Sequence, residues 1–158
     1  MSNAIPITKA GFESIKEELK DLLTVQRPRI QKEIATAREH GDLRENAEYH
    51  AAKERQGFIE GRIQEINGKM PHFQVVEPGK MNNSSVAFGA TVTIQNTETE
   101  EKITYQIVGQ EEADVKTNRI SFQTPIAKAL IGKKVGDVVA ITVPKGKMEV
   151  EIVDLSWS

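Results

Sequence analysis

The chain is expected to reverse direction within one polar stretch, His40-Gly41-Asp42-Leu43-Arg44-Glu45-Asn46-Ala47-Glu48-Tyr49. Gly41 readily adopts the left-handed conformation with which helices commonly end. Asp42 can accept hydrogen bonds from the first free amides of a following helix, and Glu45 three residues later completes a variant of the capping box. The stretch therefore predicts a tight turn between two helices.

A long amphipathic helix is predicted before this turn. Thr8 can cap its first amides, and the pattern runs to about Glu39, roughly 45 Å at 1.5 Å per residue. Pro28 lies inside the pattern, and a bend is expected there in preference to a break, because proline removes a backbone hydrogen bond and crowds the preceding turn. Apolar residues recur on one face at Phe12, Ile15, Leu19, Leu22, Ile30, Ile34 and Ala37.

A second amphipathic helix is predicted after the turn, ending near Asn67-Gly68 and Pro71. Its expected apolar face consists of Ala47, Ala51, Phe58, Ile59, Ile63, Ile66 and Met70. Two long helices joined by so short a turn would each bury their apolar face against the other. Residues 1–76 are therefore predicted to form an antiparallel coiled-coil hairpin with an acidic tip at 39–48.

The pattern changes after Pro71, where residues 77–85 are rich in turn formers. A short helix is expected at 125–132, because proline stands in its first turn and glycine at its end. The acidic runs 98–101 and 111–114 are expected to be solvated turns. Alternating or β-branched segments predict strands at 90–95, 103–108, 119–122, 138–143 and 150–155. Residues 80–158 thus form a small, mainly antiparallel domain, and the fold class is α+β.

The composition limits the classes of function. The chain has 158 residues, a net charge of −2 and no cysteine. The charge argues against a protein held to nucleic acid mainly by electrostatic attraction, and the lack of cysteine excludes disulfides and thiolate metal sites. No signal-peptide pattern or membrane-spanning apolar run is present, so a cytoplasmic protein without membrane contact is expected. A monomer is expected, since the hairpin buries its own apolar faces.

Carboxylates are concentrated at the predicted tip, where Glu39, Asp42, Glu45 and Glu48 fall within ten residues. On spacing alone, a helix cap is the favoured interpretation of Asp42 and Glu45. A helix N-terminus also favours ionised carboxylates, which are good oxygen ligands for Mg²⁺. Two carboxylates are too few to hold Mg²⁺ alone. The chemistry they suggest is completion of a metal site that a partner supplies.

Most basic and histidine side chains near the tip can be explained by surface charge pairing, by packing or by exposure to solvent. Surface charge pairing is the ordinary interpretation of four basic residues beside the tip and is expected to hold for some of them, namely among Arg38, Arg44, Lys53 and Arg55. Arg38 and Lys53 are expected at comparable depth on the two helices, where together they could meet a phosphate chain. The three histidines do not have metal-ligand spacing and are expected to be solvated or packed. Neither a nucleophile elbow nor a phosphate-binding glycine loop occurs.

The tip motif resembles the signature of the bacterial Gre transcript-cleavage factors, specifically the GreA type. The resemblance covers nearly the whole chain in order. It rests on Ala37-Arg38-Glu39-His40-Gly41-Asp42-Leu43-Arg44-Glu45-Asn46-Ala47-Glu48-Tyr49-His50-Ala51-Ala52-Lys53-Glu54, on Ile5-Pro6, on Phe88-Gly89-Ala90-Thr91-Val92, on Ile107-Val108-Gly109, and on residues 121–136 with their core Pro125-Ile126-Ala127-Lys128-Ala129-Leu130-Ile131-Gly132.

The resemblance implies a coiled-coil hairpin followed by an FKBP-like domain. It implies that the FKBP-like domain docks on RNA polymerase through the segment around Thr124 and Pro125, and that the hairpin enters the secondary channel. Asp42 and Glu45 would then help hold a catalytic Mg²⁺ that is shared with the active centre of the polymerase. This chain alone is expected to bind no cofactor stably.

In this scheme, Arg38 and Lys53 face the nascent RNA. The backtracked RNA is cleaved at its 3′ end by the polymerase's own hydrolytic activity, so the chain alone is not an enzyme. Lysine at 53 keeps the charge of the arginine often found there but not its bidentate geometry.

Two other functions remain open from the sequence. A channel-occupying regulator of the same shape would inhibit without cleavage, although the presence of both Asp42 and Glu45 argues against it. An FKBP-like domain also suggests a prolyl isomerase or chaperone, but such a fold hosts unrelated functions. With Tyr49, Tyr105 and five phenylalanines, the chain has few aromatic residues for a proline-binding pocket.

Overall fold

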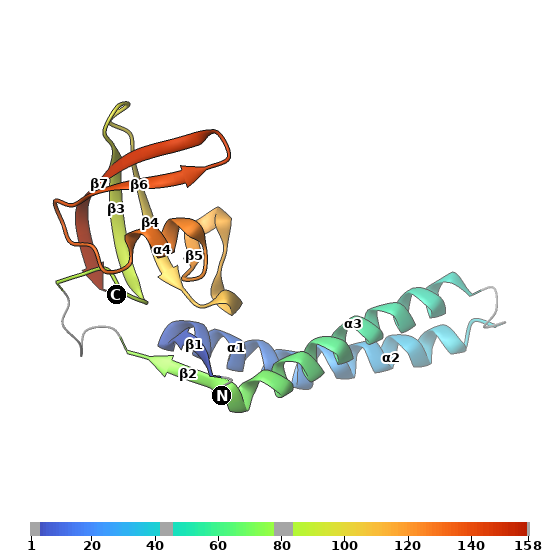
Figure 1. Ribbon diagram of the computed structural model, residues 1–158. Helices are drawn as coiled ribbons and strands as arrows, with labels where there is room; N and C mark the ends of the chain where they lie inside the picture. Colours follow the sequence, from blue (N-terminus) through green and yellow to red (C-terminus); the bar gives the residue numbers. More distant parts are fainter. Residues whose placement is uncertain (1–3, 42–45, 78–83, 158) are drawn as a thin grey trace. The chain divides into compact units, whose positions relative to one another are not determined.

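The computed structural model describes residues 4–41, 46–77 and 84–157. The described residues form two compact units, one within Met1–Gly11 and Gln74–Ser158 and the other within Phe12–Phe73. The second unit is a helical hairpin and the first is a small β-rich unit, each of which can be followed in Figure 1. The predicted α+β class is confirmed.

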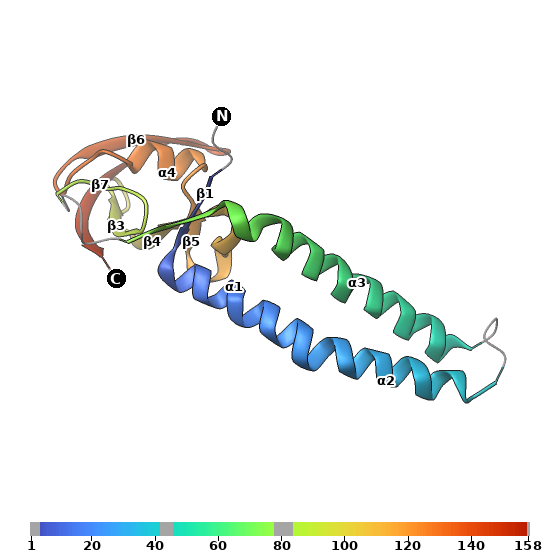
Figure 2. The same cartoon turned by 90° about the horizontal axis from the view of Figure 1, so that it is seen from below.

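The first arm of the hairpin begins directly after strand β1 (Ile5–Thr8). Helix α1 (Lys9–Asp21), the π-helical segment η1 (Leu22–Gln26) and helix α2 (Arg27–Arg38) follow one another without interruption (Figure 2). Thr8 caps α1 as predicted, because its Oγ1 accepts a hydrogen bond of 3.0 Å from the Gly11 amide. The predicted helix therefore exists over nearly its full expected length.

Pro28 does not break this helix, so the break, the less favoured of the two expectations, does not occur. The wide turn of η1 lies immediately before the proline, and the Arg27 amide donates to the Leu22 carbonyl, five residues back. Proline crowds the carbonyl four residues earlier, here that of Thr24, and a π-turn in place of an α-turn relieves that conflict. The Thr24 hydroxyl in turn donates to the Lys20 carbonyl at 2.7 Å.

The second arm is helix α3 (Ala47–Lys69), which continues through the 3₁₀ turn η2 (Met70–His72) into strand β2 (Phe73–Val76). Strands β1 and β2 form a two-stranded sheet that the sequence patterns did not predict. Near this end of the hairpin the rings of Phe12 and Phe73 meet edge to face, with their centroids 6.1 Å apart.

The interface between the two arms is a narrow strip of apolar side chains, which we call the seam. The first apolar face is confirmed, since Ile15, Leu22, Ile30, Ile34 and Ala37 are all buried. The second is only partly right: Ile63 and Ile66 are buried, but Ala52 takes the place expected for Ala51, and Phe58 is 71% exposed. The predicted face is displaced by one residue at these two positions. Coiled-coil spacing is followed by the buried Ala52, Ile63 and Ile66 and by the half-buried Ile59. Ala51 and Phe58 each lie one residue before a position of that pattern.

The β-rich unit contains a five-stranded sheet with strand order β5-β4-β3-β7-β6. Four of its strands pair antiparallel, and β5 pairs parallel with β4. The strands are β3 (Ala90–Asn96), β4 (Lys102–Val108), β5 (Arg119–Ser121), β6 (Val138–Val143) and β7 (Gly146–Trp157), and each overlaps a predicted strand. Helix α4 (Pro125–Leu130) is shorter by two residues than expected.

The core of this unit lies between the sheet and α4, whose Ala127 and Leu130 are fully buried. Leu130 and the sheet residues Ile107 and Ile152 are each 0% exposed. The boundary between the units differs from the predicted division into 1–76 and 80–158, because the described residues up to Gly11 belong with the β-rich unit. Glu112 binds Thr8 directly, which explains why the N-terminal segment stays with that unit.

Candidate functional site

The described residues flanking the hairpin turn show how the turn is closed. Asn46 Oδ1 accepts a 3.0 Å hydrogen bond from the Tyr49 amide and so caps α3, while Asn46 Nδ2 donates at 2.6 Å to the carbonyl of Ala37 in α2. One side chain therefore starts the second helix and joins it to the end of the first. The predicted cap, Asp42, is wrong for this helix, which begins four residues later than expected.

Asp42 and Glu45 lie outside the described residues, so their predicted role as metal-binding acids stays a prediction. The neighbouring carboxylates Glu39 and Glu48 are exposed on either side of the turn. Among residues 4–41, 46–77 and 84–157, no group of three or more histidine, cysteine or acidic side chains could hold a metal ion.

The two predicted RNA-facing residues both lie toward the turn end of the hairpin, Arg38 on α2 and Lys53 on α3. Arg38 is the last residue of α2, and its guanidinium lies 5.8 Å from the centroid of the Tyr49 ring. Lys53 lies one helical turn beyond Tyr49 on the same side of α3, and its Nζ donates to Gln56 Oε1 at 3.1 Å. Both basic side chains are exposed, so they are available to an anionic partner.

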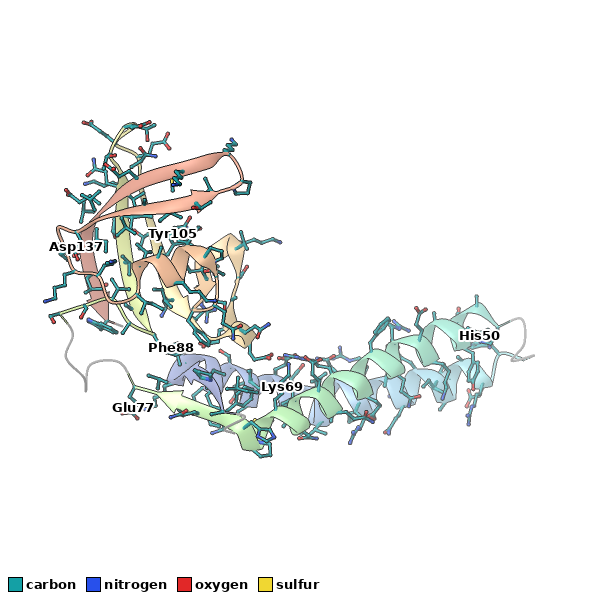
Figure 3. All side chains as sticks on the ribbon, in the orientation of Figure 1. His50, Lys69, Glu77, Phe88, Tyr105 and Asp137 are labelled. Atoms are coloured by element: carbon teal, nitrogen blue, oxygen red, sulfur yellow. The ribbon has the colours of Figure 1, made fainter. Side chains whose placement is uncertain are left out.

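His50 lies in the first turn of α3, next to the turn end of the hairpin (Figure 3). Its ring is in edge-to-face contact with that of Tyr49, with centroids 5.6 Å apart. This ring contact agrees with the expectation that the histidines are packed or solvated. The hydroxyl-bearing ring of Tyr49 is thus flanked by an imidazole and a guanidinium.

Ion pairs between the helices keep the hairpin in one register. Arg27 makes two hydrogen bonds to the Glu60 carboxylate at 2.7 and 2.8 Å, and Arg62 makes two to Glu18, both at 2.7 Å. A further pair joins Arg55 to Glu33 at 3.0 Å, which confirms the expected surface pairing of Arg55. Hydrogen bonds from these arginines lower the pKa of Glu18 and that of Glu60 below the ordinary glutamate value.

One face of the hairpin has an open groove of about 820 Å³ between α2 and α3. Ala37, Ala51, Ala52 and the exposed Phe58 contribute apolar surface to it. Charged residues of both signs, among them Arg29, Lys32, Glu48 and Glu54, form the rest of its lining. Small residues line the groove on both helices near the turn, which keeps this end of the hairpin slender.

The predicted docking segment is a rigid turn at the start of α4. Thr124 Oγ1 accepts from the Ala127 amide at 3.2 Å and donates to the Ser121 carbonyl at 2.9 Å. Pro125 occupies the first helical turn and is exposed. The ring of Pro125 is thus held in a fixed place on the surface of the β-rich unit.

The aromatic residues invoked for a prolyl isomerase lie in different units. Tyr105 packs against the core of the β-rich unit (Figure 3), and Tyr49 belongs to the hairpin unit. Separately, none of the helices in the described ranges is long and apolar enough to cross a membrane.

Two functional candidates were missed by sequence reasoning. Asn46 could have been found, because asparagine is among the strongest N-cap residues and Tyr49 follows it by three. Glu112, expected in a solvated turn, is instead buried, with its side chain only 1% exposed. No local signal marks that burial, since its partner Thr8 lies 104 residues earlier in the chain.

Two family models together match almost the whole chain. The model described as "Transcription elongation factor, N-terminal" matches residues 5–75, and that described as "Transcription elongation factor, GreA/GreB, C-term" matches residues 81–156. The boundary between the matches falls close to that between hairpin and sheet.

Curated relatives extend this similarity over full chains. The transcription elongation factor GreA of Pelobacter propionicus is 54% identical over 99% of both chains. That of Haemophilus influenzae is 55% identical over 97% of this chain and 98% of its own. A crystal structure of GreA factor homolog 1 from Thermus thermophilus is 28% identical, with a TM-score of 0.44 over 98% of this chain and 99% of its own. The chain belongs to the GreA/GreB family of transcription elongation factors and is of the GreA type.

Proposed function

We propose that this elongation factor binds RNA polymerase, inserts its hairpin into the secondary channel and stimulates cleavage of backtracked nascent RNA. The observation that carries the proposal is the hairpin itself, whose two arms bury their apolar faces against each other and are joined through a sequence that contains Asp42 and Glu45. Full-length similarity to GreA factors supports it. In this proposal the polymerase performs the hydrolysis, and this chain supplies acidic side chains that help complete its metal site.

Asp42 and Glu45 are the residues of this chain that would hold a Mg²⁺ ion shared with the polymerase. When bound, such an ion stabilises charge on the oxygens that attack and leave the RNA phosphate. The exposed Arg38 and Lys53 would attract the phosphates of the RNA that approaches the turn. Asn46 caps α3, so the proposal does not require Asp42 as the N-cap of that helix.

The decisive experiment measures RNA cleavage in a stalled, backtracked polymerase complex. Asp42→Asn and Glu45→Gln should each slow stimulated cleavage by roughly a hundredfold, the scale of losing one group that stabilises transition-state charge. Polymerase binding and the melting temperature should stay unchanged, because the helix cap is Asn46. Glu54→Gln, a loss of one exposed charge elsewhere on the hairpin, is the matched control and should cleave normally.

Two outcomes would refute the catalytic assignment. If both tip variants bind polymerase and stimulate cleavage as the unaltered chain does, Asp42 and Glu45 are not the reactive pair. If the unaltered chain binds and slows transcription without any cleavage, it is a channel-occupying regulator.

The segment around Thr124 and Pro125 is proposed as part of the polymerase-docking surface. Pro125→Ala should weaken polymerase binding while leaving the fold intact, because the exposed ring contributes contact area rather than core packing. Lys147→Ala, at an exposed position near the start of β7, serves as the control. Competition binding to polymerase would measure both variants, and equal affinities would remove this segment from the docking surface.

A further inference from the structure

Phe58 is an aromatic residue that the packing of the hairpin does not use. It lies in the middle of α3 and is 71% exposed, whereas the seam residues Ile59 and Ile63 that follow it are half-buried and buried. An exposed aromatic ring leaves a large apolar area in water. Single exposed apolar residues are common on soluble proteins, so the ring is informative only if the surface around it is also apolar.

The surface around Phe58 is the open groove of about 820 Å³ between α2 and α3. These two helices run side by side in both ribbon views (Figures 1 and 2). Ala51 precedes Phe58 by seven residues, so both lie on the same side of α3, and both line the groove together with the buried Ala37 and Ala52. The two apolar residues that lie off the seam pattern therefore share a second apolar surface.

The charges that line this groove are only partly neutralised within the hairpin. On the α2 side, Arg29 and Lys32 are exposed, and neither makes an ion pair with another described residue. On the α3 side, the guanidinium of Arg55 is already held by Glu33 at 3.0 Å, and Glu48 is an exposed acid. The α2 side thus carries positive charge for which a partner would have to supply the acids.

These features favour one class of partner. A nucleic acid would place its phosphates near Glu48 and against an apolar floor, which is unfavourable. A groove between two helices suits a third helix, whose apolar side chains fill the groove while charged residues beside them pair with the walls. Arg29 and Lys32 require the residues on the α2 side of such a helix to be acidic.

We propose that this groove, lined by Ala37, Ala51, Ala52 and Phe58, is a docking surface for an amphipathic helix of RNA polymerase that carries acidic residues beside its apolar stripe. The inference rests on the proposed function, which makes polymerase the partner of the hairpin. Phe58 is the apolar anchor of the contact, and the alanines leave room for the side chains of the incoming helix. The contact provides affinity and takes no part in the chemistry.

The test measures binding of the full-length chain to core RNA polymerase. Phe58→Ala removes the anchor, and Ala51→Leu fills the groove while keeping a residue of high helix propensity. Arg29→Glu reverses a charge on the α2 side. Each variant has a control that makes a similar change at an exposed residue of the hairpin unit outside the groove, namely Val25→Ala, Gln64→Leu and Lys20→Glu.

The three groove variants should each weaken polymerase binding by about tenfold or more, the scale of an anchor residue at a protein interface. The three controls should bind as the unaltered chain does. Helix content and melting temperature, followed by circular dichroism, should stay nearly the same in all six, because every altered residue is exposed. At saturating concentration the groove variants should stimulate cleavage at the normal rate, since Asp42 and Glu45 are retained.

A photocrosslink identifies what occupies the groove. With p-benzoylphenylalanine at position 58, the chain should crosslink to polymerase, and peptide mapping should place the crosslink on a helix with acidic residues beside its apolar stripe. A crosslink to the nascent RNA or to a second copy of this chain would overturn the assignment, as would one to a non-helical segment of polymerase.

The binding data have three further outcomes that would overturn the inference. Groove variants that bind as tightly as their controls would remove the groove from the interface. Equal weakening by groove variants and controls would show a general effect of the hairpin surface. Normal binding with slower cleavage at saturation would place the groove in the chemistry. Failure of the proposed function is recognised separately, because the unaltered chain would then not stimulate cleavage of backtracked RNA.

Discussion

The hairpin and the β-rich unit are held together by different interactions. The β-rich unit has a compact core in which Ile107, Leu130 and Ile152 are fully buried. The hairpin has a seam one row of side chains wide, flanked by arginine–glutamate pairs such as Arg27–Glu60. A thin seam with charged flanks gives a slender rod, at the cost of burying little apolar surface. The comparison predicts that the two units differ in where they are vulnerable.

The largest expected effect is in the core of the β-rich unit. Ile152→Ala removes a fully buried side chain and should lower the free energy of unfolding of that unit by about 2–5 kcal/mol. Urea unfolding followed by emission of Trp157, the only tryptophan, reports this unit. Val115→Ala, at an 87% exposed side chain, should have little effect. An equal shift of the helical signal would show that the two units unfold together, which would break the comparison.

A smaller effect is expected at the turn end of the hairpin. Asn46→Ala removes both the cap of α3 and the bond to Ala37, and should destabilise the hairpin by about 1 kcal/mol. Circular dichroism at the helical minimum would measure it. Asn67→Ala, at an exposed position inside α3, should be neutral or slightly stabilising, because alanine favours the helix more than asparagine does. Equal losses in both variants would contradict the capping role.

The smallest expected effect is a loss of stability at low pH. The hydrogen bonds from Arg62 lower the pKa of Glu18 in the folded chain below its ordinary value of 4.5. Stability from this pair is therefore fully present above pH 4.5 and is lost as the pH falls through the lower folded pKa. The melting temperatures of the unaltered chain and of Glu18→Gln should differ near neutral pH and converge in that acid range. Glu17→Gln, at an exposed neighbour, is the control, and a constant difference across the range would refute the assignment.

Most of the fold follows from local pattern. The coiled-coil spacing of the helices and the alternation of the strands are properties of short windows, so α1, α2, α3 and the five-stranded sheet were predictable. Strands β1 and β2 were not, because each has four residues and exists only through pairing with the other. The π-turn before Pro28 was not predictable either, because it depends both on the steric demand of the proline and on keeping Leu22 and Ile30 buried between the two arms.

The candidate site was predictable to a lesser degree. Asp42 and Asn46 are both good capping residues, and local chemistry does not choose between them. The bond from Asn46 to Ala37, which joins the two helices, favours the later start. Glu112 depends on a contact 104 residues away, and no nearby pattern could indicate it. The catalytic roles of Asp42 and Glu45 stay predictions, which the cleavage assay tests.

The π-turn has a consequence for the far end of the hairpin. Eight residues separate Leu22 from Ile30, and at about 100° per residue they would overshoot two turns of an α-helix by about 80°. The wider turn of η1 removes much of that angle, so that both residues are buried in the seam. Deleting one residue from Leu22–Gln26 would rotate α2, with Arg38 at its end, by about 100° around the helix axis relative to α1. The direction in which Arg38 extends from α2 thus depends on residues near the middle of this arm that take no part in the proposed chemistry.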